Sequence, residues 1–189
     1  MALISYPELA AAAEDVRAQY DQHRNEHAHF DELRHMLVRF PAALSAADGM
    51  YHRIMNEGHL GRMLREQIFL VTSHERGCSY AVAAHGRWLV ANTDMSGTDV
   101  AALLRLEAVR GVSDRARALL AYTRKVAAAP YKIVAADLDD LYEVGWTQPE
   151  IVEALTVVSL SGWMNSYANS LGLQGSADRT QSAKTAEGS

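Results

Sequence analysis

The chain has 189 residues, of which 49% are hydrophobic, and 18 Lys and Arg against 23 Asp and Glu give a formal net charge of −5 at pH 7. This content suffices for one substantial core, while the acidic balance argues against a nucleic-acid partner and gives no polybasic patch for a membrane surface. No apolar run reaches the roughly 18 residues of a membrane span. The single cysteine excludes an internal disulfide, and the amino terminus lacks a charged region followed by an apolar one, so we expect a cytoplasmic protein.

Apolar residues recur at helical spacing along almost the whole chain, and strand-like alternation is nearly absent. We expect a first helix from Pro7 to about Arg24 and a second from about His29 to Val38, which ends before Pro41. The other expected helices are Pro41 to about Glu57, Leu60 to about His74, Cys78 to about Ala91, Thr98 to Leu106, the Ser113 cap to Pro130, Asp137 to Val144, and Pro149 to Leu171. Such helices bury their apolar faces only against one another, so the expected fold class is an all-α bundle.

Domain organisation follows from the same pattern. Nothing within residues 1–173 demands a second domain, so we expect a single helical domain there. Residues 174–189 are polar and rich in Ser, Thr, Ala and Gly without apolar spacing, which predicts a disordered tail.

Several residues that could take part in catalysis lie close to Gly77 in the sequence. Cys78 and His85 lie at i and i+7, along one stripe of a predicted helix, with the small Ala81 between them. Because Gly77 breaks the preceding helix, Cys78 begins the next one, where unpaired backbone N–H groups are expected to lower the pKa of the thiol toward neutrality. Glu66, on the preceding helix, would return across the turn to face His85 and orient the imidazole as a proton acceptor.

Each of these residues also has a structural interpretation. A lone buried Cys78 is usually a small apolar side chain without chemistry, and His85 alone is more often a core or surface histidine. Glu66 alone is more often a solvated helix residue or a partner of Arg62 or Arg65. Their order around the glycine break favours a functional site.

Glu66, Ser73, Cys78 and His85 match, in order and spacing, a signature of Glu followed by Ser-x-x-x-x-Cys-x-x-Cys-x-x-x-His. The chain therefore resembles the AhpD-like, or carboxymuconolactone decarboxylase, family, and most closely its subgroup of peroxidase-related enzymes. The likeness extends over most of residues 30–173. It implies an AhpD-like helical bundle that associates as a homo-oligomer, acts as an antioxidant peroxidase, and needs neither a cofactor nor a metal ion.

The chain departs from the family signature at two positions. Ala81 occupies the place of the second cysteine, which in the family attacks peroxide while the first cysteine resolves the product. Tyr80 stands where alkylhydroperoxidase D has a histidine. Without two thiols the dithiol cycle cannot run. Three explanations stay open: a natural one-cysteine variant, an engineered cysteine-to-alanine change, and a relative whose chemistry is not redox.

The resemblance favours the first of three functions and leaves the other two open as alternatives. In the first, a thiol-dependent hydroperoxide reductase, Glu66 holds His85, Cys78 supplies the sulfur, and an external thiol or protein reductant restores it. In the second, Glu66 and His85 act as acid and base on a small carboxylated lactone, without redox chemistry. In the third, the chain is a non-catalytic helical oligomer. The family also places the helix of Asn165 and Tyr167 near the site, so these two residues and Tyr80 are possible cleft-lining residues.

A competing motif runs from His23 to His27, which reads H-x-x-E-H, a pattern in which two histidines bind zinc and the glutamate activates water. It lies at an expected helix end among polar residues, and His29 and His35 indicate simple enrichment in histidine. We therefore expect no zinc site there.

Overall fold

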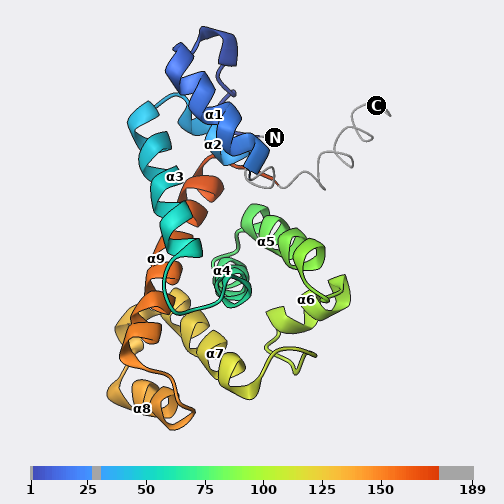
Figure 1. Cartoon of the computed structure of the whole chain (residues 1–189), viewed down its shortest axis with the longest axis vertical. Coiled ribbons are helices and arrows are strands. Elements are labelled where there is room, and N and C mark those ends of the chain that lie inside the picture. The colour runs from blue at the N-terminus through green and yellow to red at the C-terminus, as the bar shows by residue number, and fades with distance from the viewer. Residues whose placement is uncertain (1, 27–30, 175–189) are drawn as a thin grey trace.

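The computed structural model describes residues 2–26 and 31–174, and its fold is all-α, as the sequence predicted. This part of the chain contains nine α-helices and no strand (Figure 1). The helices are α1 (Glu14–Glu26), α2 (Asp31–Leu37), α3 (Pro41–Asn56), α4 (Arg62–Glu75), α5 (Ser79–Asn92), α6 (Gly97–Leu104), α7 (Asp114–Ala128), α8 (Ala135–Glu143) and α9 (Gln148–Ser170). Among the described residues, none of these helices has the length and apolar character needed to cross a membrane.

Helix α4 lies at the centre of the bundle. It packs against α3, α5, α6, α7 and α9, and Figure 1 shows it almost end-on with these helices around it. Every residue from Arg65 to Ser73 is buried. The run Ile68-Phe69-Leu70-Val71 supplies apolar side chains to all sides of the helix, which is typical of a helix enclosed by others. Polar side chains on α4 must therefore find partners within the protein.

Local signals in the sequence fix most helix boundaries. Pro41 occupies the first turn of α3, and Ser96 forms a capping box with Asp99 at the start of α6. Ser113 accepts a hydrogen bond from the Ala116 N–H at the start of α7. Gly77, with φ of +63°, makes the turn between α4 and α5, a conformation that glycine adopts without steric cost.

Two expected boundaries were wrong. The first helix begins at Glu14 rather than Pro7, because the Ala-rich stretch before it is largely exposed and forms only a single 3-10 turn, Leu9–Ala11. Helix α6 ends at Leu104 because Leu106 has a φ of +58°, which no α-helix accommodates. The expected start of the second helix at His29 and the expected tail from 175 onward lie outside the described residues.

Glu153 on α9 links the turn between α3 and α4 to the rest of the bundle through hydrogen bonds. Its carboxylate accepts hydrogen bonds from the backbone N–H groups of His59 (2.8 Å) and Leu60 (3.0 Å) and from the buried guanidinium of Arg65 (2.9 Å). Gly58 permits this approach, since a Cβ there would lie 2.7 Å from the carboxylate. Burial acts to raise the pKa of Glu153, but these hydrogen bonds outweigh it and lower the pKa to about 2.

Replacing Glu153 by Gln is expected to lower the free energy of unfolding at pH 7 by about 1–2 kcal/mol, a value discounted for partial exposure. A depressed carboxyl pKa stabilises the folded state above the ordinary value of 4.5, and that contribution is lost as pH falls toward about 2. In urea unfolding, the free energies of unfolding of the wild type and of Glu153→Gln should therefore converge as the pH falls from 4.5 toward about 2. Glu143→Gln, at an exposed position on α8, is the control, and an equal loss in both variants would contradict this role.

Candidate active site

The turn at Gly77 brings Glu66 on α4 to His85 on α5, as the sequence predicted. His85 Nδ1 lies 2.5 Å from Glu66 Oε2, and both side chains are fully buried. Helices α4 and α5 pack against each other. An ionisable acid and an imidazole are thus held against each other in the interior, where their electrostatic interaction is stronger than in water.

Phe69 fixes the plane of the imidazole. Its ring stacks on that of His85, with ring centroids 3.9 Å apart and an angle of 24° between the planes. Since Nδ1 faces Glu66, Nε2 is the ring nitrogen through which His85 would exchange a proton with a substrate.

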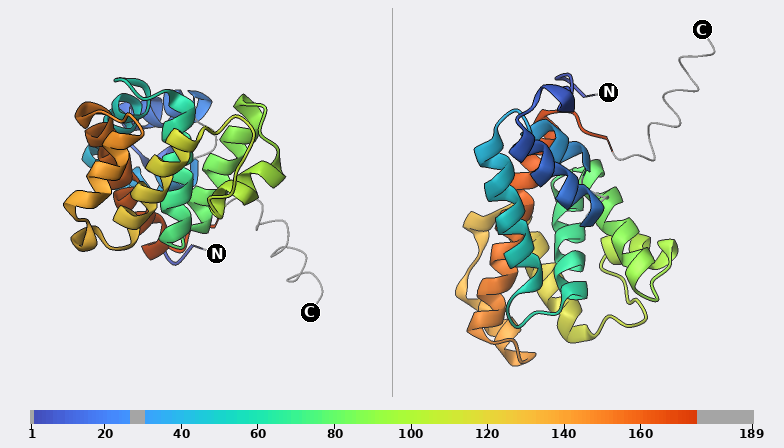
Figure 2. Two further views of the ribbon diagram at one scale, coloured as in Figure 1. Left: turned by 90° about the horizontal axis from the view of Figure 1, so that it is seen from below. Right: turned by 45° about the horizontal axis from the view of Figure 1, so that its top comes forward.

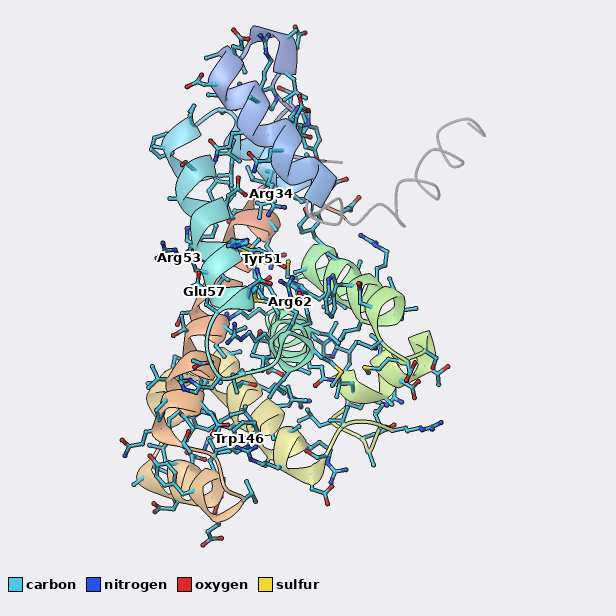
Figure 3. The ribbon with its side chains drawn as sticks, in the orientation of Figure 1. Arg34, Tyr51, Arg53, Glu57, Arg62 and Trp146 are labelled. Atoms are coloured by element: carbon cyan, nitrogen blue, oxygen red, sulfur yellow. The ribbon has the colours of Figure 1, made fainter. Side chains whose placement is uncertain are left out.

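Arg62 forms the outer end of this arrangement. Its Nη2 lies 2.6 Å from Glu66 Oε1, and it also donates to the Tyr51 hydroxyl at 3.2 Å and to Asn56 Oδ1 at 2.6 Å. The guanidinium lies over the rings of Tyr51 and Trp88, at 5.7 and 5.2 Å from their centroids. Figure 3 shows Tyr51 and Arg62 next to each other where α3 meets α4. The side chain of Arg62 is 22% exposed, so the polar chain runs from the surface to His85.

These contacts set the charge of the site. Burial raises the pKa of Glu66, but His85 and Arg62 outweigh it and hold that pKa below its usual value. The carboxylate therefore stays ionised at neutral pH. Burial, and then the Glu66 charge, raise the pKa of Tyr51, so its phenol stays protonated.

Arg62 pairs with Glu66 at i−4, one of the two partners that the sequence allowed, whereas Arg65 binds Glu153 instead. Tyr51 was not singled out, because no motif or spacing links α3 to the site.

The sulfur of Cys78 has a different environment from the one expected. Cys78 is the N-cap residue of α5, but its side chain is fully buried. Burial raises the pKa of the thiol, and the backbone N–H groups of Ala81 and Tyr80 offset this only in part. The expectation of a thiol pKa lowered toward neutrality was therefore wrong, because desolvation outweighs the helix N-terminus.

Position along α5 separates the sulfur from the imidazole. Seven residues at 1.5 Å each place Cys78 about 10 Å from His85 along the helix axis. Ala81, 3% exposed, lies only about one turn from His85 and presents a methyl group there.

The three possible cleft-lining residues occupy different places. The Tyr80 hydroxyl accepts a hydrogen bond from the Leu33 N–H at 3.2 Å and so links α5 to α2. Asn165 is buried between α9 and α4, where it accepts from the Ser73 hydroxyl at 3.1 Å. Tyr167 lines a surface pocket with Trp163, its ring centroid 5.8 Å from that of the indole. The structure does not bring Tyr167 together with Glu66 and His85.

The H-x-x-E-H pattern ends at His27, which lies outside the described residues. Within residues 2–26 and 31–174, no group of three His, Cys, Asp or Glu side chains has an arrangement that could hold a metal ion.

Comparisons with known proteins agree with this fold. Residues 41–125 match the model of the carboxymuconolactone decarboxylase family, and no curated protein matches the chain. A peroxidase-related protein with the alkylhydroperoxidase AhpD core, from Ralstonia eutropha JMP134, has a TM-score of 0.81 at 24% identity, over 94% of this chain and 93% of that chain. A peroxidase-related protein from Silicibacter sp. TM1040 has a TM-score of 0.78 at 21% identity, over 94% and 93%.

A cysteine-to-alanine variant of the debrominase Bmp8, in complex with 2,3,4-tribromopyrrole, is also similar. Its TM-score is 0.78 at 15% identity, over 96% of both chains. At these identities the likeness to solved structures shows the fold alone.

Replacing Arg62 by Met is expected to raise the pKa of Glu66, because the guanidinium that pairs with the carboxylate and helps to hold it ionised is lost. Stability at neutral pH should fall by about 1–3 kcal/mol. Carbon-13 NMR titration of the glutamate side chains measures the change. Arg87→Met, on α5, is the control, and a Glu66 titration that is the same in both variants would exclude Arg62 as the group that sets this charge.

Proposed function

Because the chain belongs to the carboxymuconolactone decarboxylase family, we propose that it is an enzyme that uses Glu66 and His85 to move a proton on a small carbonyl compound, such as a carboxylated lactone. The observation that carries the proposal is the buried contact between Glu66 Oε2 and His85 Nδ1. A carboxylate on one ring nitrogen orients the imidazole and fixes its tautomer, so that the other nitrogen is the one that can accept a proton.

Each member of the site has a distinct part in this reaction. His85 takes a proton from the carbon next to the carbonyl group, and the electron pair of the broken C–H bond passes into an enolate. The imidazolium then lies against the Glu66 carboxylate, which stabilises its charge in the buried site. Arg62 holds Glu66 in the ionised form, so that the proton stays on His85. In an isomerisation, the imidazolium returns the proton to the substrate at another carbon. In a decarboxylation, no proton is abstracted first: the carboxylate departs as CO2, the electron pair of the broken C–C bond forms the enolate, and an imidazolium at His85 protonates it at carbon.

The placement of the sulfur favours this chemistry over a dithiol cycle. Cys78 has a raised pKa and lies about two helical turns from His85, whereas the position one turn away carries the methyl group of Ala81. The only thiol of the chain is therefore not the neighbour of the imidazole on α5.

Replacing His85 by Ala is expected to lower kcat/KM by at least about a hundredfold, since a positioned general base contributes 10²–10⁴-fold. Cys78→Ala should retain activity within about threefold, because the thiol takes no part. Conversion of carboxymuconolactone, followed by its ultraviolet absorbance, is the assay. His74→Ala, at an exposed position on α4, is the control. Loss of activity in Cys78→Ala with a normal unfolding curve would contradict the acid–base role.

One observation favours a second candidate function, a thiol-dependent hydroperoxide reductase. Cys78 stands at the N-cap of α5, where hydrogen bonds from the N–H groups of Ala81 and Tyr80 offset part of the rise in thiol pKa that burial causes. In this reaction the thiolate attacks the terminal oxygen of a hydroperoxide, the O–O bond breaks, and an alcohol leaves as the sulfur becomes a sulfenic acid. An external thiol then reduces the sulfenic acid and releases water.

Under this second function, Ala81→Cys should raise hydroperoxide consumption with dithiothreitol at least tenfold, because a thiol one turn from His85 can pass its proton to the imidazole. The increase should vanish when His85→Ala is added. Ala83→Cys, two positions further along α5, is the matched control. An equal increase in both cysteine variants, or none in Ala81→Cys, would rule out a latent peroxidase site.

A further inference from the structure

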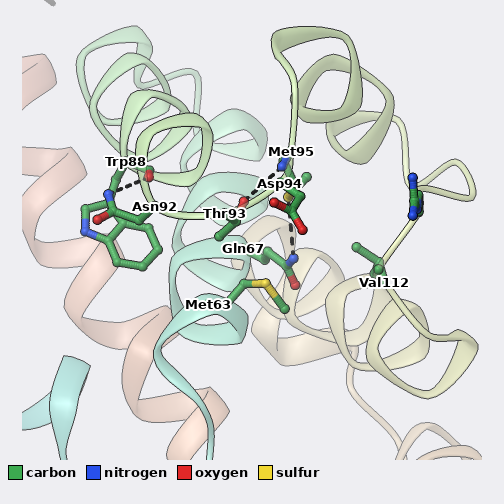
Figure 4. Close-up of a pocket in the computed structure, with 10 residues that line it drawn as sticks. Met63, Gln67, Trp88, Asn92, Thr93, Asp94, Met95 and Val112 are labelled. Atoms are coloured by element: carbon green, nitrogen blue, oxygen red, sulfur yellow. Dashed lines mark hydrogen bonds between the residues drawn. The ribbon is translucent and has the colours of Figure 1, made fainter.

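A cavity lies next to the candidate active site, lined by Gln67, which follows Glu66 on α4, and by Trp88, on which Arg62 packs. It has a volume of about 440 Å³ and is enclosed by α4, the end of α5, and the loops at residues 93–95 and 110–112 (Figure 4). Neither Glu66, His85 nor Cys78 lines it. Its size falls in the range of small-molecule pockets, about 300–1,000 Å³.

Gln67 places a carboxamide in the wall of this cavity. The residue is 1% exposed, and Figure 4 shows it between Trp88 on one side and Val112 on the other. Among the described residues, its one polar side-chain contact is from Nε2 to the Met95 sulfur at 3.8 Å. A thioether is a weak acceptor, and a carboxamide has two donors and an acceptor oxygen to satisfy. A buried amide with this much unused hydrogen-bonding capacity indicates a polar ligand.

The aromatic and thioether side chains that line the rest of the cavity favour a ligand with a flat ring. The indole of Trp88 and the thioethers of Met63 and Met95 line the cavity. Aromatic faces and polarisable sulfur both make favourable contacts with unsaturated rings. The Trp88 ring is held in position by the Arg62 guanidinium, 5.2 Å from its centroid.

Charge favours an uncharged ligand. Arg110 and Asp94, both exposed, line the cavity, so that its lining carries one positive and one negative side chain. No net field then selects an anion or a cation.

We propose that this cavity binds a small, uncharged, planar ring compound that bears a carboxamide or lactam group, which stacks on Trp88 and pairs with the Gln67 carboxamide. A carboxamide presents a donor and an acceptor side by side, and the Gln67 amide offers the complementary pair. This cavity takes no part in the proposed acid–base reaction, so binding measurements test the proposal independently of that reaction.

Benzamide is the probe, and titration calorimetry with the wild-type chain is the measurement. A Kd of about 1 mM is expected for so small a ligand. Benzoate tests the preference for an uncharged group, and cyclohexanecarboxamide tests the need for a planar ring. Both should bind at least about fivefold more weakly than benzamide.

Gln67→Leu should weaken benzamide binding at least tenfold, since the ligand amide would then be buried against an apolar side chain. Gln148→Leu, at an exposed position at the start of α9, is the matched control and should bind as the wild type does. If Gln67→Leu fails to fold, Gln67→Met replaces it, because methionine is similar in length and flexibility. No binding by the wild type, equal binding by Gln67→Leu, or tighter binding of benzoate would each overturn the proposal.

Discussion

An ionised carboxylate buried in the central helix of the bundle is the constraint on which the site depends. Glu66 lies on a stretch of α4 that neighbouring helices cover completely, and an isolated charge there would be strongly unfavourable. His85 from α5 and Arg62 from the first turn of α4 supply its partners, and Arg62 in turn contacts Tyr51 on α3. The packing of α3, α4 and α5 therefore decides the charge and orientation of the imidazole.

The geometry of α5 places the thiol of Cys78 apart from the imidazole of His85. A second cysteine at position 81 would lie between them. A helix advances about 5.4 Å per turn, so a residue four positions before His85 is its neighbour and one seven positions before it is not. Ala81 takes the near position and Cys78 the distant one. Burial of Cys78 then keeps its thiol protonated. Beside the imidazole this chain therefore has the Glu66 carboxylate, while its single cysteine lies about two helical turns away along α5.

The helices and the acid–imidazole pair could be predicted from the sequence because both depend on local signals. Helical spacing, prolines and capping residues define the elements, and Gly77 fixes the turn that returns Glu66 to His85. Burial could not be predicted in this way, since the exposure of Cys78 depends on helices distant in the chain. For the same reason, Tyr51 and the Gln67 cavity could not be identified from the sequence, and the Ala-rich stretch before Glu14, which is largely exposed, was expected to be helical.

The central claim is that the Glu66 carboxylate holds the Nδ1–H of His85 in a buried hydrogen bond. Proton NMR of the protein with 15N-labelled histidine tests this most directly, because such a proton is strongly deshielded and protected from exchange with water. We expect one such resonance, correlated to a histidine Nδ1, which disappears in Glu66→Gln and persists in Cys78→Ala. If that resonance is absent from the wild type, or survives in Glu66→Gln, then the pair is not the one on which the site depends.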